Sequence, residues 1–231
     1  MDLQLHQVQM RILRHLLMNS IDSFSQMAKE SKLPSDHFNY HLSCLHKTGY
    51  ILKEGDKYKL TRTGKEFANR MDTEKNVIEK QAKLGALLII SKVENGKKYL
   101  LIQKRLKEPY YGFTGFITGK VAWGEKILET ATRELMEEAG LTAKLDFQFI
   151  IHEHVYHKDD GRLLEDKFFY IFKGSNPKGD LISLPSGENY WMLEDDFKKL
   201  KKVYYDEFEL LELVEKGQKE LIEKEYWIEE F

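Results

Sequence analysis

Three glutamates of one short segment have a spacing that could hold a metal ion. Glu134, Glu137 and Glu138 stand three and four residues apart, so a helix would carry their carboxylates on one side. Like charges at this spacing destabilise a helix, and the neighbouring Arg133 can relieve only part of the repulsion. Mg²⁺ prefers a few carboxylate oxygens together with phosphates and water. The segment therefore indicates either a divalent-cation site or an ordinary solvated acidic helix.

A glycine-bearing loop followed by a helix must position these side chains. Gly119 and Gly124 let the backbone turn tightly and approach a ligand closely. Residues 127–139 then have helical spacing, with an apolar stripe made of Leu128, Ala131, Leu135 and Ala139. Gly140 follows as a C-terminal stop. The sequence thus predicts a helix with one buried face and one acidic face.

The whole stretch from Gly119 to Leu141 resembles the Nudix box. That pattern is glycine, five residues, glutamate, seven residues, and then Arg-Glu-aliphatic-x-Glu-Glu-x-Gly-aliphatic, and every fixed position is matched. So many specified positions make the match far more specific than a lone glycine motif. The resemblance implies a Nudix α/β/α sandwich that hydrolyses the pyrophosphate of a nucleoside diphosphate linked to another group, using Mg²⁺ or Mn²⁺.

The resemblance also implies roles for individual residues. The metal ligands are expected to be three carboxylates and one backbone carbonyl: Glu134, Glu137, Glu138 and Thr118. Arg133 is expected to hold a box glutamate in place, with Gly119 and Glu125 supporting the same network.

The general base and the substrate contacts lie partly outside the box. Glu134 is one candidate for the base. The other is an acid from beyond the box, for which Glu188 is our first choice and Glu153, Glu165 and Asp166 are alternatives. Substrate contacts are expected from basic and aromatic side chains before the box: Lys104, Arg105, Tyr111, Phe113 and Phe116. For each aromatic residue, core packing is the alternative role.

Histidines gather in residues 152–157, downstream of the box. On a strand, His152 and His154 share a face while His157 points away. Zinc sites need at least three protein ligands, and the sequence indicates no third convergent ligand. We therefore do not expect a metal site at these histidines.

Residues 1–72 resemble a winged helix-turn-helix domain. Helices are expected over residues 3–18, 23–31 and 35–46, followed by a hairpin and a closing helix. Such a domain would bind double-stranded DNA through its recognition helix and wing: Asn39, Tyr40, Ser43, Lys53, Lys57 and Lys59. The segment has 11 Lys+Arg against 8 Asp+Glu, hence only +3. Dimerisation or protein contacts are therefore the alternative role.

Composition bounds the remaining possibilities. The 231 residues are 42% hydrophobic and 32% charged with a net charge of −2, which is typical of a soluble globular protein. The single Cys44 cannot form an intrachain disulfide. The longest apolar run, residues 84–90, is too short to cross a bilayer, and no secretory signal is visible. We expect a cytoplasmic homodimer that does not bind membranes.

These observations predict an α+β chain in three parts: a winged helix-turn-helix in residues 1–72, a linker in 73–83 and a Nudix α/β/α sandwich in 84–231. Two functions stay open. One is a Mg²⁺-dependent hydrolase acting on a nucleotide-type substrate, with a DNA-binding regulatory front domain. The alternative is a transcriptional regulator whose Nudix domain senses a nucleotide-type metabolite. The complete box favours retained catalysis.

Overall fold

The chain divides into two compact units, Met1–Lys80 and Gln81–Phe231, here called the N-terminal unit and the C-terminal unit. The computed structural model describes residues 5–72, 77–78 and 80–229. The predicted linker, 73–83, therefore lies partly outside the described residues. Where it is described, β5 (Val77–Ile78) pairs antiparallel with β4 (Met71–Asp72), and Lys83 already begins the first long strand.

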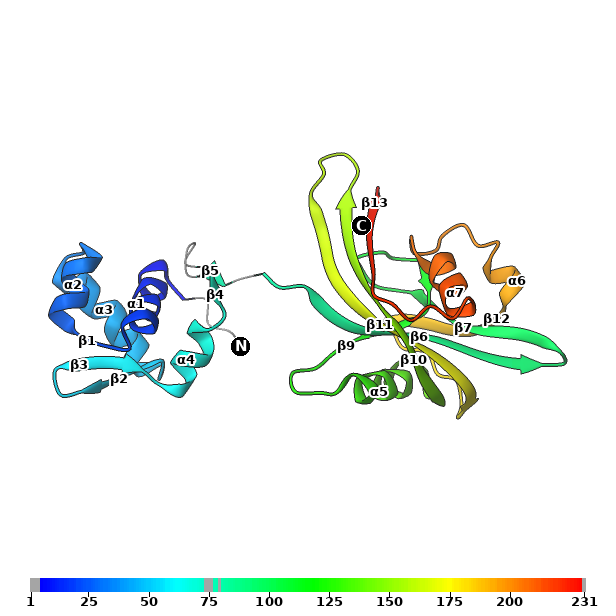
Figure 1. The fold of residues 1–231 in the computed structure, drawn as a ribbon, viewed down its shortest axis with the longest axis horizontal. Coiled ribbons are helices and arrows are strands. Elements are labelled where there is room, and N and C mark those ends of the chain that lie inside the picture. The colour runs from blue at the N-terminus through cyan, green and yellow to red at the C-terminus, as the bar shows by residue number, and fades with distance from the viewer. Residues whose placement is uncertain (1–4, 73–76, 79, 230–231) are drawn as a thin grey trace. The chain divides into compact units, whose positions relative to one another are not determined.

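The N-terminal unit consists of helices packed on a small sheet (Figure 1). Its elements are α1 (Gln7–Asn19), β1 (Ile21–Ser23), α2 (Phe24–Ser31), α3 (Ser35–Lys47), β2 (Ile51–Glu54), β3 (Lys57–Leu60) and α4 (Arg62–Ala68). The three predicted helices agree with α1, α2 and α3 to within a few residues. The short strand β1 was not predicted, and it pairs with β3 to give the sheet order β1-β3-β2. Leu13, Phe38 and Leu45 are fully buried in the core.

The C-terminal unit is built on an eight-stranded sheet. Its path runs β12-β7-β6-β11-β10-β13, with β8 paired to β7 and β9 paired to β6. β11 is parallel to β6 and β13 is parallel to β10, and the other pairs are antiparallel. The strands are β6 (Lys83–Glu94), β7 (Lys97–Arg105), β8 (Thr114–Gly115), β9 (Ile117–Lys120), β10 (Thr142–His157), β11 (Leu163–Lys178), β12 (Gly187–Leu193) and β13 (Ile222–Ile228).

Helices cover both faces of this sheet. Figure 1 shows α5 (Ile127–Ala139) on one face and both α6 (Glu194–Phe197) and α7 (Glu207–Glu215) on the other. Strand side chains alternate between faces, so Leu87 packs in the core beneath α6 and α7 while Leu88 packs in the core beneath α5. A strand buried on both faces is expected to be a continuous apolar run, as residues 84–90 are.

The sheet contains strand segments that the sequence does not indicate. Strand β11 continues as far as Lys178. A Cβ at Gly174, within this strand, would overlap the side chain of Ile90. Glycine at this position therefore allows the strand to pack closely against Ile90. The C-terminal residues form β13, which was not predicted because its partner β10 is distant in sequence. Among the described residues, no helix is both long and apolar enough to cross a bilayer.

Candidate functional site

Helix α5 presents its acidic side chains at one wall of a cleft in the C-terminal unit. Ala131, Leu135 and Ala139 are buried against the sheet, as predicted. Leu128 was predicted to join them but is 52% exposed. The helix ends at Gly140, whose backbone has φ +70° and donates to the carbonyls of the last turn. This left-handed conformation is one that glycine adopts at little cost.

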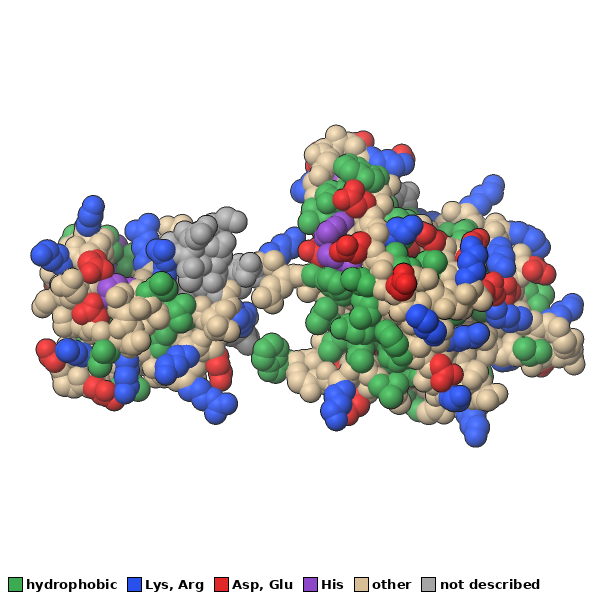
Figure 2. All heavy atoms as spheres, viewed as in Figure 1, with side chains coloured by type: hydrophobic (Ala, Val, Ile, Leu, Met, Phe, Trp, Pro, Cys, Tyr) green, Lys and Arg blue, Asp and Glu red, His purple; other side chains and the backbone are tan. Residues whose placement is uncertain are grey.

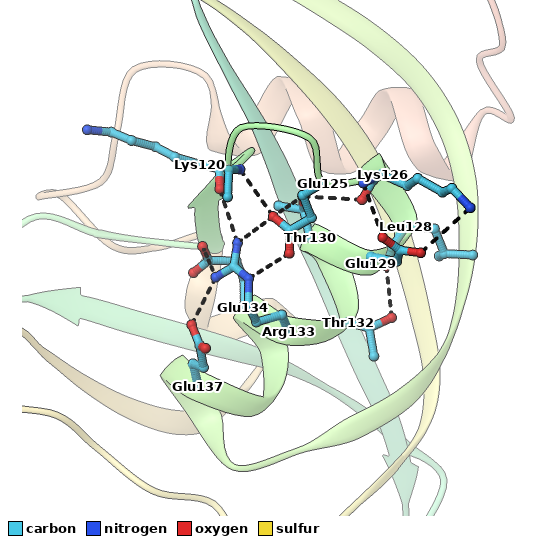
Figure 3. Close-up of polar contacts among 11 residues, drawn as sticks. Lys120, Glu125, Lys126, Leu128, Glu129, Thr130, Thr132, Arg133, Glu134 and Glu137 are labelled. Carbon is cyan, nitrogen blue, oxygen red and sulfur yellow. Dashed lines mark hydrogen bonds and ion pairs between the residues drawn. The ribbon is translucent and has the colours of Figure 1, made fainter.

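Arg133 connects the acidic side chains of the helix to the preceding loop (Figure 3). Its Nε and Nη2 donate to the two carboxylate oxygens of Glu125 at 2.7 and 2.8 Å. Its Nη1 donates to Glu134 at 2.7 Å and to Glu137 at 2.9 Å. The guanidinium therefore offsets the repulsion among these acids and fixes the direction of each carboxylate. The expectation that Arg133 holds a box glutamate agrees with these contacts.

Glu125 fixes the loop to the helix. Besides Arg133, it accepts from the backbone N–H of Ala122 at 3.1 Å and from the Thr130 hydroxyl at 2.7 Å. The hydrogen bonds from Arg133 and Thr130 lower the pKa of Glu125 to about 2. The carboxylate is thus ionised at neutral pH and acts as a permanent anchor for Arg133.

Glu134 and Glu138 turn their carboxylates into the cleft. Glu134 packs against Gly119, where a Cβ would overlap the glutamate side chain, so residue 119 must be glycine for Glu134 to keep this position. Burial raises the pKa of Glu134, and the negative charges of Glu138 and Glu137 add to this effect, whereas Arg133 opposes it. Glu138 accepts from the Gln103 side-chain amide at 3.1 Å.

The cleft has a volume of about 700 Å³. Several predicted site residues line it: Arg105, Phe116, Thr118, Gly119, Glu134 and Glu138. Glu137 lies outside the lining with its side chain 58% exposed, although it contacts Arg133. Sequence reasoning missed other basic side chains that line the cleft: Lys83, Lys107, Lys120 and Lys167.

Other predicted site residues lie away from the cleft. Lys104 and Glu188 are cross-strand neighbours on β7 and β12, both exposed on the face opposite to Gln103, which lines the cleft. Tyr111 is exposed and outside the lining. Phe113 packs edge-on against Tyr110 and is also outside the lining, so core packing describes it better than substrate contact.

The candidates for the general base differ in whether they face the cleft, because successive residues of a strand point to opposite faces of the sheet. Glu165 lines the cleft, where its two oxygens pair with Lys83 and Lys167 at 2.9 Å. Asp166, the next residue, is outside the lining and contacts His152 instead. Glu153 is fully buried behind the cleft wall. Glu134 and Glu165 are therefore the candidates that reach the cleft.

Two acidic residues at the start of α7, which sequence reasoning missed, line the opposite end of the cleft. Asp206 and Glu207 are buried there, beside Phe116 and Tyr204. Glu207 accepts from the backbone N–H of Phe116 at 3.1 Å, while its second oxygen, Oε2, has no hydrogen-bond partner. Burial and the neighbouring Asp206 raise the pKa of Glu207 well above its usual value. Both effects favour the neutral carboxylic acid of Glu207, the form that can donate a hydrogen bond.

The buried acids continue behind this end of the cleft as a network around Lys167. Glu153 accepts from the Tyr205 hydroxyl at 3.3 Å and lies 3.7 Å from the Lys167 ammonium. Burial and Asp206 raise its pKa well above the usual value. One lysine among Glu153, Asp206 and Glu207 leaves an excess of carboxyl groups, and burial and this excess together raise the pKa values of Glu153 and Glu207. In the sequence, these acids could have been noticed from the run Tyr-Tyr-Asp-Glu at the start of an amphipathic helix.

The predicted DNA-binding residues of the N-terminal unit lie on α3 and the β2–β3 hairpin. Asn39 and Tyr40 are exposed on α3, and Ser43 lines a small pocket beside Lys53. Lys57 is exposed on the hairpin. Lys59 forms an ion pair with Glu54, which partly neutralises its charge.

The fold and the box geometry together define a family. Residues 83–214, more than half of the chain, match the model of the NUDIX domain. The chain therefore belongs to the NUDIX family, which confirms the predicted fold of the C-terminal unit.

Two solved structures show the same fold. A mutator MutT protein from Bacillus halodurans is 22% identical, with 64% of this chain and 93% of that chain covered and a TM-score of 0.53. The NUDIX domain of Shewanella oneidensis NrtR, solved in complex with ADP ribose, is 14% identical. That match covers 68% of this chain and 98% of that chain with a TM-score of 0.52. At these identities the likeness concerns the fold.

Proposed function

We propose that the protein is a Mg²⁺-dependent hydrolase that cleaves the pyrophosphate of a nucleoside diphosphate linked to another group. One observation carries this proposal: Glu134 and Glu138 enter a cleft of about 700 Å³ that basic side chains also line. Phosphoryl chemistry requires positive charge around the phosphates and a positioned water, and little covalent chemistry from the protein. The cleft combines these requirements.

The donor set fits a hard divalent cation. Glu134, Glu138 and the backbone of Thr118 offer oxygen atoms, which Mg²⁺ and Mn²⁺ prefer, and all three residues line the cleft. Burial is the main cause of the raised pKa of Glu134, and the nearby charges of Glu138 and Glu137 add to it. A bound cation would neutralise phosphate charge and orient the attacking water. In this proposal Glu137 holds Arg133 in position.

The basic side chains and one carboxylate have separate tasks. Lys120 and Lys107, both exposed, are proposed to bind the diphosphate oxygens. We assign the general base to Glu134, because Arg133 holds only its Oε1, whereas both oxygens of Glu165 are paired with lysines. Arg105 instead holds the neighbouring loop, since its Nε donates to the carbonyl of Lys107 at 3.0 Å.

The opposite end of the cleft fits a nucleobase. Phe116 and Tyr204 provide ring surfaces there, and the buried Oε2 of Glu207, which has no hydrogen-bond partner, would donate a hydrogen bond in the neutral form that burial favours. A nucleobase presents ring nitrogen and carbonyl acceptors to such a donor. The substrate would then lie with its base near α7 and its diphosphate near α5.

The test is turnover of a panel of nucleoside diphosphate derivatives, including ADP ribose and nucleoside triphosphates, with Mg²⁺. The wild type should release products from at least one, and Glu138→Gln should lower kcat by about 10²-fold or more, because it removes a carboxylate facing the diphosphate. Glu129→Gln is the matched control on the same helix: Glu129 caps α5 and lies outside the cleft lining. Equal rates for Glu138→Gln and wild type would contradict the proposal.

We further propose that residues 1–72 form a winged helix-turn-helix domain that binds double-stranded DNA. The support is the packing of α1, α2 and α3 on the β1-β3-β2 sheet, with Asn39 and Tyr40 exposed on α3. Here α3 would enter the major groove and the β2–β3 hairpin would act as the wing. The domain would make the protein a regulator as well as an enzyme.

DNA binding can be measured by fluorescence anisotropy with duplexes selected from a random pool. Lys53→Ala with Lys57→Ala should weaken binding for all sequences and reduce the slope of log K against log[salt] by about 2, since each phosphate contact contributes about 0.9. Lys126→Ala, an exposed lysine of the C-terminal unit, is the control. The alternative function, a transcriptional regulator that senses a nucleotide, would be favoured by a different result. In that case the protein would hydrolyse no substrate of the panel, and a nucleotide would release it from its DNA site.

A further inference from the structure

Two histidines and an aspartate converge on the outer face of the C-terminal sheet. His152 Nε2 lies 2.9 Å from Asp166 Oδ1, and His154 Nε2 lies 3.7 Å from the same oxygen. One ligand atom from each of the three side chains can lie within 4.8 Å of the others. Figure 2 shows histidine side chains beside acidic ones on the long β10–β11 hairpin. Asp166 is thus the third convergent ligand, which the sequence alone did not indicate.

The strand register explains why these residues meet. His154 and Asp166 are direct partners across the antiparallel β10–β11 pair, and His152 is two residues from His154 on the same face. Glu153, between the two histidines, points to the opposite face and is fully buried. The cluster therefore lies on the other side of the sheet from the cleft, and none of its members lines the cleft.

Surrounding contacts fix the orientation of His152. Its ring stacks on Phe168 with centroids 3.8 Å apart and planes 11° apart. Its Nδ1 lies 3.3 Å from Glu223 on the neighbouring strand β13. Metal-binding histidines usually donate their second ring N–H to a carboxylate in this way, which leaves the other nitrogen free to bind the ion.

The spacings of the ligand atoms give a second argument. The Nε2 atoms of His152 and His154 lie 2.9 and 3.7 Å from Asp166 Oδ1. Ligand atoms about 2.0–2.1 Å from a tetrahedral zinc lie about 3.3 Å apart, which falls between these two distances.

We propose that His152, His154 and Asp166 form a binding site for a borderline transition-metal ion, of which Zn²⁺ is the representative. Two imidazoles and one carboxylate suit zinc better than Mg²⁺, which prefers oxygen ligands alone. Three protein ligands leave a fourth position for water or for another molecule. The ion would join β10 to β11 directly behind the cleft wall that Glu165 and Lys167 form.

The test is calorimetric titration of Zn²⁺ into the full chain with Mg²⁺ in excess, with Co²⁺ as a visible-absorption reporter of coordination. We expect one ion per chain at this site, with affinity reduced at least about tenfold in His154→Ala and in Asp166→Asn. His157→Ala is the matched control, since that histidine is on the same strand but points away. Glu138→Gln should bind Zn²⁺ like the wild type, which separates this site from the cleft.

A second pair of histidines could bind the same ions, so the titration is repeated in a His37→Ala background. His37 and His41 are one helical turn apart on α3, with their Nε2 atoms 3.1 Å apart. Long-range ¹H–¹⁵N spectra of the wild type provide a test without substitution, because Zn²⁺ should shift the Nε2 signals of His152 and His154. Unshifted signals, or equal affinity in Asp166→Asn and wild type, would overturn the proposal.

Discussion

Arg133 is the residue on which the geometry of the acidic wall depends. It contacts Glu125, Glu134 and Glu137 at once, and no shorter side chain could reach all three. We expect Arg133→Ala to lower kcat/KM by about 10–100-fold and to raise the Mg²⁺ concentration required, because the freed carboxylates repel and reorient. Steady-state rates across a Mg²⁺ titration measure both effects.

The control for this substitution is Arg62→Ala, which removes an arginine that is 93% exposed in the N-terminal unit and should leave rates unchanged. A wild-type Mg²⁺ profile for Arg133→Ala would show that the carboxylates keep their positions without the guanidinium.

At the residue scale, the relative positions of helix-borne side chains follow from the sequence more directly than those of strand-borne ones. Glu134 and Glu138 share a side because of spacing within one helix, whose geometry is local. Lys104 and Glu188 lie outside the cleft lining, because neighbouring residues of a strand point to opposite faces and the sequence alone does not say which face meets the cleft. The face to which each strand residue points depends on pairing between segments far apart in sequence.

At the scale of elements, the start of α7 makes the stability of the C-terminal unit sensitive to rising pH. Glu207 has its pKa raised by burial and by Asp206. A carboxyl with a raised folded-state pKa takes up a proton on folding, so its contribution to stability is lost as pH rises from the unfolded pKa towards the folded one. The free energy of unfolding should therefore fall as pH rises from about 4.5.

Glu207→Gln should flatten this pH dependence, by up to about 1.4 kcal/mol per pH unit for one proton. The amide oxygen can still accept from the Phe116 N–H. Urea denaturation between pH 5 and 8 measures the effect, and tryptophan fluorescence follows the C-terminal unit alone because Trp123, Trp191 and Trp227 all lie there. Glu212→Gln, an exposed glutamate of the same helix, should keep the wild-type slope.

Elements with a strong local pattern were predicted, and those defined by their partners were not. Helix α5 follows from periodicity, and the apolar run of residues 84–90 lies within strand β6. Strands β1, β9 and β13 are short or polar, and each exists because a distant strand pairs with it. Helix α7 begins at Glu207, and the tyrosines that precede it line the cleft.

At the scale of the whole molecule, all residues of the cleft belong to the C-terminal unit. A fragment comprising residues 81–231 should therefore hydrolyse the substrate of the full chain with kcat/KM within about twofold. Comparing the two proteins side by side measures this. A loss of tenfold or more, with circular dichroism showing a folded fragment, would mean that the N-terminal unit contributes to catalysis.

Strand β6 also governs the order in which the chain can fold during synthesis. It is the first strand of its sheet to leave the ribosome, yet its parallel partner β11 ends only at Lys178. At roughly 5–20 residues per second, the apolar segment from Leu87 to Ile90 waits on the order of ten seconds for that partner. We expect the N-terminal unit, a separate compact unit, to fold in that time, whereas the nascent C-terminal unit still exposes an unpaired apolar strand edge. Chaperone demand during translation should therefore concentrate in this interval.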